Sequence, residues 1–262
     1  MTEEVLLGID AGTSSLKICA FTRDGRVVAK AQRMVPVVTP YPLWAEIDLE
    51  RYWSLTVEAL HEIADRVGPI VAVGMATTCP TTIVLDAQDK PLRPGIVYLD
   101  GRAEGLLQER VGGDPLAYQT HTGNRASPST CWAVNLAWLR RNEPQLWPRV
   151  RRVMMLNGFL ALRLTGRAAM EATQASYSGL MDVREPVATW SPQLLQLSGV
   201  GPAEFLQQMG VRDVTVTGSL KFDIVPPEPM LALGARWREQ FGQRPVLLCA
   251  STREGEETLL LD

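Results

Sequence analysis

The stretch that decides the fold is Val5-Leu-Leu-Gly-Ile-Asp-Ala-Gly-Thr-Ser-Ser-Leu-Lys-Ile-Cys-Ala-Phe21. It consists of two short apolar runs of strand type on either side of a polar turn. Thr22-Arg-Asp-Gly25 follows, and Asp-Gly is a strong hairpin signal. Residues 26–38 then have the composition of a third strand, which Pro36 helps to close. The sequence therefore predicts that the chain opens with a three-stranded antiparallel meander.

A helix is predicted next, because Asp48 can cap an N-terminus and Gly68-Pro69 can end a helix. Its apolar positions recur every three or four residues, at Trp53, Val57, Leu60, Ala64 and Val67. A buried strand is expected at 70–75, and two further strands at 83–85 and 96–98.

From residue 103 onward the pattern is mostly helical. The helices expected from periodicity are 103–111, 129–141, 157–164, 191–198, 202–208 and 229–241. Residues 245–249 return to strand character. A meander, a helix and further strands indicate an α/β fold with a mixed sheet, in one continuous domain that carries a helical insertion at about 103–190.

The composition excludes several classes of protein. The 262 residues are 46% hydrophobic and 21% charged, with a net charge of -3, so no basic field favours nucleic acid or an anionic membrane. The acidic N-terminus lacks the features of a signal peptide, and no apolar run reaches membrane-spanning length, so a cytoplasmic protein is expected. Four dispersed cysteines and two histidines argue against a zinc site or a disulfide framework.

The turn between the first two strands has the chemistry of a phosphate site. Gly12 lets the backbone approach a ligand closely, and successive N–H groups in such a turn form an anion-binding concavity. Lys17 can add positive charge, and Asp10 can hold a hydrated magnesium ion. Three hydroxyls in the turn offer further donors: Thr13, Ser14 and Ser15.

A polar hairpin turn without a ligand is the alternative interpretation of this segment. The P-loop and the dinucleotide fingerprint are both excluded, because each of those glycine-rich loops leads into a helix. Here the turn leads into a second strand.

Residues 8–17 resemble the first phosphate motif of the superfamily that contains actin, hexokinase and the heat-shock ATPases. Further stretches are similar to the FGGY carbohydrate kinases, the group that includes xylulokinases and glycerol kinases. In the family's order, over roughly residues 5–200, they are Trp44-Ala-Glu-Ile-Asp48, Leu85–Arg102, Leu160–Gly166, and Gln174–Asp182 followed by Trp190. The resemblance implies an actin-like ATPase (ribonuclease H-like) domain with a mixed five-stranded sheet flanked by helices, and an N-terminal, sugar-binding domain at 1–250.

The resemblance also implies where a sugar or polyol binds. The matching segment is Thr77-Thr-Cys-Pro-Thr-Thr82, in which Cys79 and Pro80 occupy positions where the family commonly has hydrogen-bonding side chains. These two side chains bond hydroxyls poorly, so Thr78, Thr81 or backbone groups are expected to substitute around Cys79. A plain threonine-rich loop is the alternative.

Asp100 and Arg102 are further expected sugar ligands, since a carboxylate accepts bonds from vicinal hydroxyls and a guanidinium offers a fork of donors. The alternative is a structural salt bridge across a turn. Asn124 is a candidate from a loop near the same cleft. Trp44, Glu46 and Asp48 are instead expected to fix the helix start and the domain packing.

The activity implied by the resemblance is transfer of the γ-phosphoryl group of ATP to a hydroxyl of a small, xylulose-like sugar or polyol, with Mg²⁺ and an Asp as base. That Asp is expected near Thr252, but Ala250-Ser-Thr-Arg253 contains none. Residues 251–262 form an atypical tail, and the family's C-terminal nucleotide-binding domain is not found in this sequence. Truncation or a reading-frame change near residue 250 is therefore expected.

Three interpretations stay open. The chain is a kinase domain that is impaired alone and needs a separate C-terminal domain or a homodimer. Alternatively, it is a non-catalytic sugar-binding module or truncated pseudokinase. An actin-like or chaperone-like ATPase scaffold is disfavoured by the similarity of residues 85–102 to the kinase branch.

Overall fold

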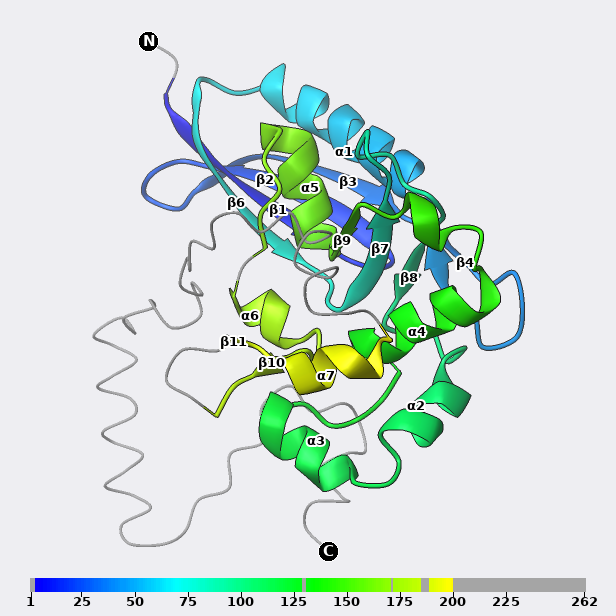
Figure 1. The fold of residues 1–262 in the computed structure, drawn as a ribbon. Coiled ribbons are helices and arrows are strands. Elements are labelled where there is room, and N and C mark those ends of the chain that lie inside the picture. Colours follow the sequence, from blue (N-terminus) through cyan, green and yellow to red (C-terminus); the bar gives the residue numbers. More distant parts are fainter. Residues whose placement is uncertain (1–2, 129–130, 171, 185–188, 200–262) are drawn as a thin grey trace, which may run out of the picture. The chain divides into compact units, whose positions relative to one another are not determined.

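The computed structural model describes residues 3–128, 131–170, 172–184 and 189–199 (Figure 1). All of them fall in one compact unit, residues 1–219. The expected helices 202–208 and 229–241, the expected strand 245–249 and the tail 251–262 lie outside the described residues.

The first sheet confirms the predicted meander. It contains β1 (Val5–Ala11), β2 (Ser15–Phe21), β3 (Val27–Met34) and β6 (Ile70–Thr77), in the order β3-β2-β1-β6. The three meander strands are antiparallel, whereas β1 and β6 are parallel, so the sheet is mixed. Within the described residues this sheet has four strands, one fewer than the five expected.

Two helices cover one face of this sheet, α1 (Leu49–Ala64) and α5 (Leu156–Thr165) (Figure 1). The side chain of Asp48 accepts a hydrogen bond of 2.9 Å from the N–H of Arg51, which confirms the predicted cap. The apolar positions that recur in the sequence are not the most buried ones of α1, although Trp53 and Leu60 are partly buried and pack against the core. The fully buried residues are Leu49, Tyr52, Leu55, Thr56, Ala59 and Ile63. Neighbouring positions lie about 100° apart on a helix, so the face that packs against the sheet is turned by about that angle from the recurring apolar positions.

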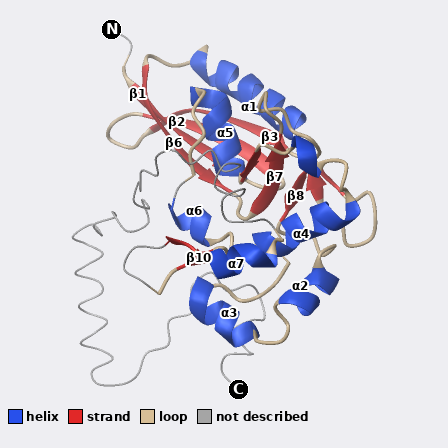
Figure 2. Ribbon diagram, viewed as in Figure 1, coloured by secondary structure: helices blue, strands red, loops and turns tan. Residues whose placement is uncertain are grey.

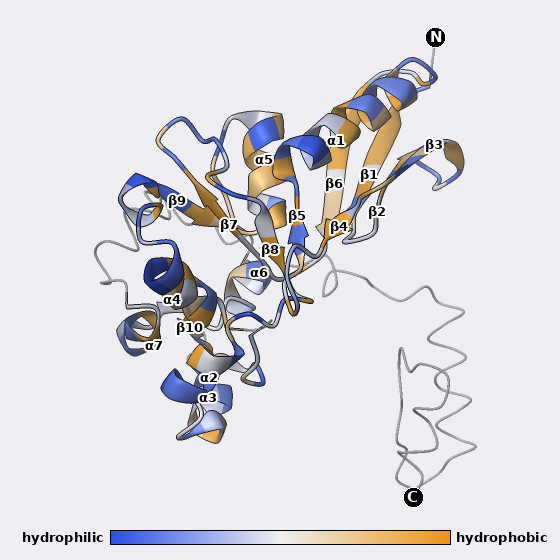
Figure 3. Cartoon of the chain, turned by 90° about the vertical axis from the view of Figure 1, so that its right-hand side faces the viewer, coloured by the Kyte–Doolittle hydropathy of each residue, from blue (hydrophilic) through white to orange (hydrophobic). Residues whose placement is uncertain are grey.

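The expectation that residues 70–75 form a buried strand is half wrong. The strand exists and lies beside β1 (Figure 3). Most of β6 is nevertheless exposed, including Val71 and Val73. Its one partner among the described strands is β1, so β6 is an edge of the described sheet. An apolar run predicts a strand but does not reveal whether that strand lies at the edge or in the centre.

A second sheet contains the other expected strands. Its members are β4 (Val37–Val38), β5 (Glu46–Ile47), β8 (Gly95–Val97), β7 (Thr81–Leu85) and β9 (Arg152–Met154), in that spatial order. All of these pairs are antiparallel. The sequence did not indicate β5 or β9, because two or three residues are too few for a recognisable period.

The remaining elements are mostly short helices (Figure 2). They are α2 (Glu104–Arg110), α3 (Pro115–Thr122), α4 (Trp132–Asn142), a 3₁₀ turn (Trp147–Arg149), α6 (Ala172–Ser176) and α7 (Pro192–Leu197), with a small hairpin of β10 (Met181–Asp182) and β11 (Thr189–Trp190). Many of them pack in a second apolar cluster around Trp132, while α5 returns to the first cluster. Within the described ranges, the chain has no helix that combines the length and apolarity needed to cross a bilayer.

Candidate functional site: a phosphate loop beside a threonine loop

The turn between β1 and β2 is closed by its own backbone. The N–H of Gly12 donates to the carbonyl of Ser15 at 3.0 Å, and a Cβ at residue 12 would stand 2.9 Å from that same oxygen. The turn therefore requires glycine at this position because of its own backbone, a reason that adds to the close approach to a ligand expected from the sequence.

The charged residues of this turn are a cross-strand pair at its base. Asp10 and Lys17 are directly opposite in the β1–β2 register, with 3.6 Å between the carboxylate and the ammonium. Their side chains are 61% and 50% exposed, respectively, so both charges face solvent. Solvent-exposed pairs interact weakly, and each group stays available to a ligand.

The backbone of the turn keeps two donors free. No described residue accepts a hydrogen bond from the N–H of Thr13 or Ser14, whereas the carbonyl of Ser14 accepts one from the N–H of Val35 at 3.0 Å. Adjacent free N–H groups beside the exposed Ser14, the half-buried Ser15 and a lysine are the components of an anion site.

The turn lies against the start of the threonine-rich segment. The hydroxyls of Thr13 and Thr78 are 2.9 Å apart, and the N–H of Thr78 donates to the carbonyl of Ala11 at 2.8 Å. The contact arises because β1 and β6 are parallel, so that their carboxyl ends lie at the same edge of the sheet. The structure thus brings together two segments that are 65 residues apart in the chain.

Sequence reasoning missed one residue of this site, Tyr52. It comes from the first turns of α1, is fully buried, and donates its phenol hydroxyl to the carbonyl of Gly12 at 3.0 Å. Burial, and to a lesser degree the negative charge of Asp10, raises the pKa of this phenol well above its usual value. The Asp48 cap was the available signal, because it fixes which residues occupy the first turns of the helix.

The two other predicted residues of the threonine-rich segment are Thr81 and Cys79. Thr81 is buried, and its hydroxyl has no hydrogen-bond partner among the described residues. Cys79 is half-buried, with its sulfur 3.6 Å from that of Met155. An unpartnered buried hydroxyl can accept a polar ligand group more readily than a thiol can.

Asp100 and Arg102 lie in a different environment, with side chains only 1% exposed. Arg102 donates from Nε at 2.8 Å to Oδ1 of Asp100, and from Nη2 at 2.7 Å to Oδ2. The same Oδ2 also accepts the N–H of Ala45 at 2.6 Å. These bonds occupy both carboxylate oxygens, so the pair has the geometry of a structural salt bridge, the alternative that the sequence left open.

More charges and rings complete this buried cluster. Glu46 accepts from Arg102 at 2.7 Å and from the buried Arg93. The guanidinium of Arg102 stacks 3.7 Å from the ring centroid of Trp44. Burial lowers the pKa of Arg93, and the neighbouring Glu143 and Glu46 carboxylates oppose that shift. The cluster fixes the segment around Trp44, as expected for Trp44 and Glu46.

Asn124 also serves the local fold. Its side-chain amide donates to the carbonyls of Ser176 at 2.8 Å and Thr122 at 3.0 Å. It therefore ties the end of α3 to α6. The structure brings together the turn at 10–17 and Thr78, but it gives Asn124 no contact with either.

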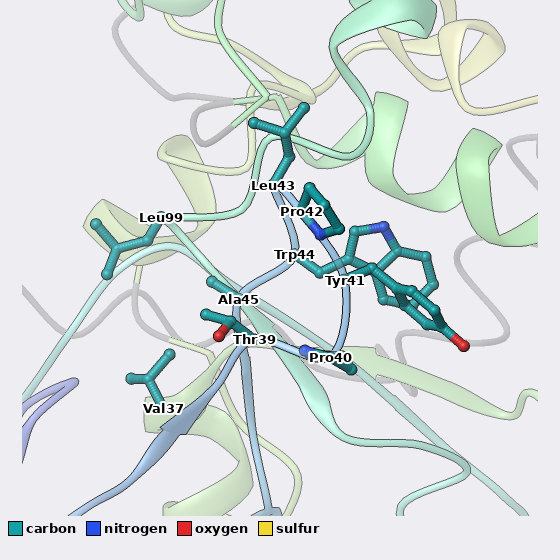
Figure 4. Close-up of a pocket in the computed structure, with 9 residues that line it drawn as sticks. All are labelled: Val37, Thr39, Pro40, Tyr41, Pro42, Leu43, Trp44, Ala45 and Leu99. Atoms are coloured by element: carbon teal, nitrogen blue, oxygen red, sulfur yellow. The ribbon is translucent and has the colours of Figure 1, made fainter.

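A hollow of about 510 Å³ is lined by the Trp44 segment (Figure 4). Its walls are mainly apolar, and they are Val37, Thr39, Pro40, Tyr41, Pro42, Leu43, Trp44, Ala45 and Leu99. The rings of Tyr41 and Trp44 meet edge to face, with their centroids 4.8 Å apart. Sugar sites need several convergent polar groups, so this hollow is a weaker candidate than the turn and Thr78.

The residues present fit a hydrated magnesium ion better than a directly bound metal. The described residues contain no group of three or more His, Cys, Asp or Glu side chains that could hold a metal ion. The exposed carboxylate of Asp10 is the acidic side chain of the turn, and Mg²⁺ usually keeps several waters when one or two carboxylates and a phosphate hold it.

Comparisons with known proteins agree with this architecture. The xylulose kinase of Escherichia coli is 33% identical over 195 residues, which are 72% of this chain and 39% of that protein. The glycerol kinase of Nocardia farcinica is 32% identical, over 74% of this chain and 40% of that protein. The chain thus spans about two fifths of the length of these relatives.

Solved structures extend the similarity to the fold. The crystal structure of xylulose kinase from Rhodospirillum rubrum has a TM-score of 0.71 with 26% identity, and covers 77% of this chain and 42% of that one. The model of the FGGY family of carbohydrate kinases, N-terminal domain, matches residues 5–216. The chain shares the actin-like ATPase fold of these neighbours. It belongs to the FGGY family of carbohydrate kinases.

Proposed function

We propose that this chain supplies the sugar-binding half of a carbohydrate kinase, which transfers the γ-phosphoryl group of ATP to a hydroxyl of a small sugar or polyol. The observation that carries the proposal is the contact between the two loops, in which the Thr13 and Thr78 hydroxyls are 2.9 Å apart. Phosphoryl transfer depends mainly on positioning and electrostatics, and a phosphate turn beside a polar loop supplies both.

Each residue of the turn has a role in this proposal. The N–H groups of Thr13 and Ser14 and the hydroxyls of Ser14 and Ser15 bind phosphate oxygens, and Lys17 offsets their negative charge. Asp10 would hold a hydrated Mg²⁺, which supplies charge neutralisation on the phosphates when it is bound. What supports these roles is the exposure of Asp10 and Lys17.

The acceptor is proposed to lie by Thr78, Cys79 and Thr81. The buried, unpartnered hydroxyl of Thr81 supports this, because a sugar hydroxyl would satisfy it. Asp100, Arg102 and Asn124 would support this site indirectly, because their hydrogen bonds hold the surrounding segments in place. A xylulose-like acceptor is favoured because two of the similar proteins are xylulose kinases.

In terms of domains, we propose that residues 1–250 form the sugar-binding domain, with helical segments between about 103 and 190, and that 251–262 form a distinct tail. A C-terminal nucleotide-binding domain or a second copy of the chain would complete the site. A cytoplasmic setting is part of this proposal.

A non-catalytic sugar-binding module is the second candidate. The sequence feature that favours it is Ala250-Ser-Thr-Arg253, where the family resemblance predicts a catalytic Asp. Such a module would bind the sugar but would not consume ATP.

The test combines calorimetry with an ATP-consumption assay on the full chain, using xylulose, other pentuloses, pentoses and glycerol. Sugar-dependent ATP consumption supports the kinase and contradicts impairment of the isolated chain. Sugar binding without consumption supports the binding module. If neither ATP with Mg²⁺ nor any of these acceptors binds, both candidates are wrong for this chain. Thr81→Val should weaken sugar binding, whereas the control Thr22→Val, which removes another buried hydroxyl in the hairpin after β2, should not.

A further inference from the structure

The carbonyl groups of the phosphate turn are held from several directions. The carbonyl of Ala11 accepts from the N–H of Thr78 at 2.8 Å, and that of Ser14 accepts from Val35 at 3.0 Å. The carbonyl of Gly12, between them, accepts from a side chain, the phenol of Tyr52, at 3.0 Å. This is the one side-chain hydroxyl among these three donors, and it belongs to a residue 40 positions away.

The planarity of the peptide bond gives this hydrogen bond a consequence for ligand binding. The carbonyl of Gly12 and the N–H of Thr13 belong to the same trans peptide unit, so they point in opposite directions. Holding the carbonyl toward Tyr52 therefore holds the N–H of Thr13 away from α1. That N–H has no acceptor among the described residues. We propose that Tyr52 is a positioning residue, which orients the peptide between Gly12 and Thr13 so that its N–H is presented to a phosphate oxygen.

The position of Tyr52 is well suited to this role. Its ring is fully buried in the apolar core, and its own N–H donates to the carbonyl of Asp48, the helix cap, at 2.9 Å. Thr56 also donates its hydroxyl to the carbonyl of Tyr52, at 2.9 Å. A side chain fixed in this way loses little additional freedom when its hydroxyl holds the turn.

The inference rests on the proposed function as far as the phosphate is concerned, but the hold on the turn can be tested without a ligand. Tyr52→Phe removes the hydroxyl and keeps the ring. Tyr118→Phe is the matched control, because Tyr118 is a buried tyrosine of the second apolar cluster. In Tyr52→Phe, we expect exchange of the Gly12 and Thr78 amide hydrogens to become about five to ten times faster, and the Gly12 carbonyl resonance to shift. Exchange of the amide hydrogens in β2 should change only as far as the global free energy of unfolding changes. Tyr118→Phe should leave exchange in the turn unchanged.

Binding of ATP with Mg²⁺, measured by calorimetry on the same variants, gives the second readout. We expect about fivefold weaker binding by Tyr52→Phe and unchanged binding by Tyr118→Phe. Unchanged exchange at Gly12 and Thr78 in Tyr52→Phe would overturn the inference whatever the nucleotide result. If the unmodified chain does not bind this nucleotide, the proposed function is contradicted for the chain. The hydrogen-exchange measurement still decides whether Tyr52 orders the turn.

A second variant keeps the test decisive if Tyr52→Phe does not fold. A ring-fluorinated tyrosine introduced at position 52 alone keeps the hydroxyl and makes it a stronger donor. We expect it to slow exchange at Gly12 relative to the unmodified chain. Faster or equal exchange would contradict the inference.

Discussion

Two acidic–basic pairs that the sequence marks as ligand sites behave in opposite ways in the structure. Asp10 and Lys17 are 3.6 Å apart, with more than half of the Asp10 side chain and half of the Lys17 side chain exposed. Asp100 and Arg102 are 2.7 Å apart and almost completely buried, with Glu46 and Ala45 as further partners. The first pair has free hydrogen-bonding capacity, whereas in the second both carboxylate oxygens are occupied and the Nη1 of Arg102 is the guanidinium nitrogen left without a partner among the described residues. A charged pair can bind a ligand only when burial and other partners have not used its atoms.

The largest effect on the free energy of unfolding is expected when the buried pair is broken. Arg102→Met keeps much of the side-chain volume but leaves the Asp100 carboxylate buried without its cation, so the free energy of unfolding should fall by about 3–5 kcal/mol. Lys17→Met is the matched change at the exposed pair and should cost less than about 1 kcal/mol. Denaturant titration measures both. Equal losses would mean that the two pairs do not differ as described.

The next effect concerns ligand binding at the exposed pair. Asp10→Asn should weaken binding of ATP with Mg²⁺ by about 10–100-fold, because it removes the carboxylate that would hold the waters of the ion. The denaturation midpoint should stay the same, since the side chain is exposed. Calorimetry measures the affinity. Glu4→Gln, at an exposed carboxylate paired with Arg23, is the control, and an equal loss there would refute a specific role for Asp10.

Alkaline pH should affect both apolar clusters. Burial is the main cause that raises the pKa of Tyr52 in the first cluster and of Tyr118 in the second. The folded protein therefore keeps these phenol protons at pH values where the unfolded chain, with a tyrosine pKa of about 10, has lost them. Because the unfolded state then binds fewer protons, stability should fall as pH rises above about 10.

The size of this alkaline effect is about 1 kcal/mol per tyrosine between pH 9 and pH 11. Thermal or denaturant unfolding at several pH values measures it. Each of the variants Tyr52→Phe and Tyr118→Phe should flatten the decline by its own share. A pH dependence that is identical in both variants and the unmodified chain would contradict the assignment to these phenols.

The smallest effect concerns the contact between the two loops. In a double-mutant cycle of Thr13→Val and Thr78→Val, we expect a coupling free energy of about 0.5–1 kcal/mol in unfolding, because each single change removes the same hydroxyl pair. Thr13→Val combined with Thr120→Val, whose hydroxyl donates to the carbonyl of Leu116 within α3, should be additive. Additivity in the first cycle would mean that the hydroxyl contact contributes nothing.

The sequence predicted local features well where one residue type has one physical use. The Asp-Gly turn gave the hairpin after β2, and Asp48 capped α1 as expected. Gly12 was singled out for its missing side chain, but the close approach of the Ser15 carbonyl that excludes a Cβ there was seen only in the structure. A prediction failed where several placements satisfy the same pattern, as with the exposure of β6.

Within the candidate site, the turn at 10–17 was found from the sequence, but its two most informative contacts were not. The hydroxyl bond to Thr78 depends on β1 and β6 lying parallel, and the bond from Tyr52 depends on how α1 packs. Neither contact has a local signature, since each joins segments that only the tertiary structure brings together.

By itself, therefore, the sequence determined the strands of the meander, the helix cap and the chemistry that each polar segment offers. The tertiary structure decided which of those groups remain available. It buried Asp100 with Arg102, where desolvation requires that every charge have a partner, and left Asp10 and Lys17 in water, where no partner is required. The physical reason is that hydrogen-bonding capacity belongs to the residue, whereas burial belongs to the fold.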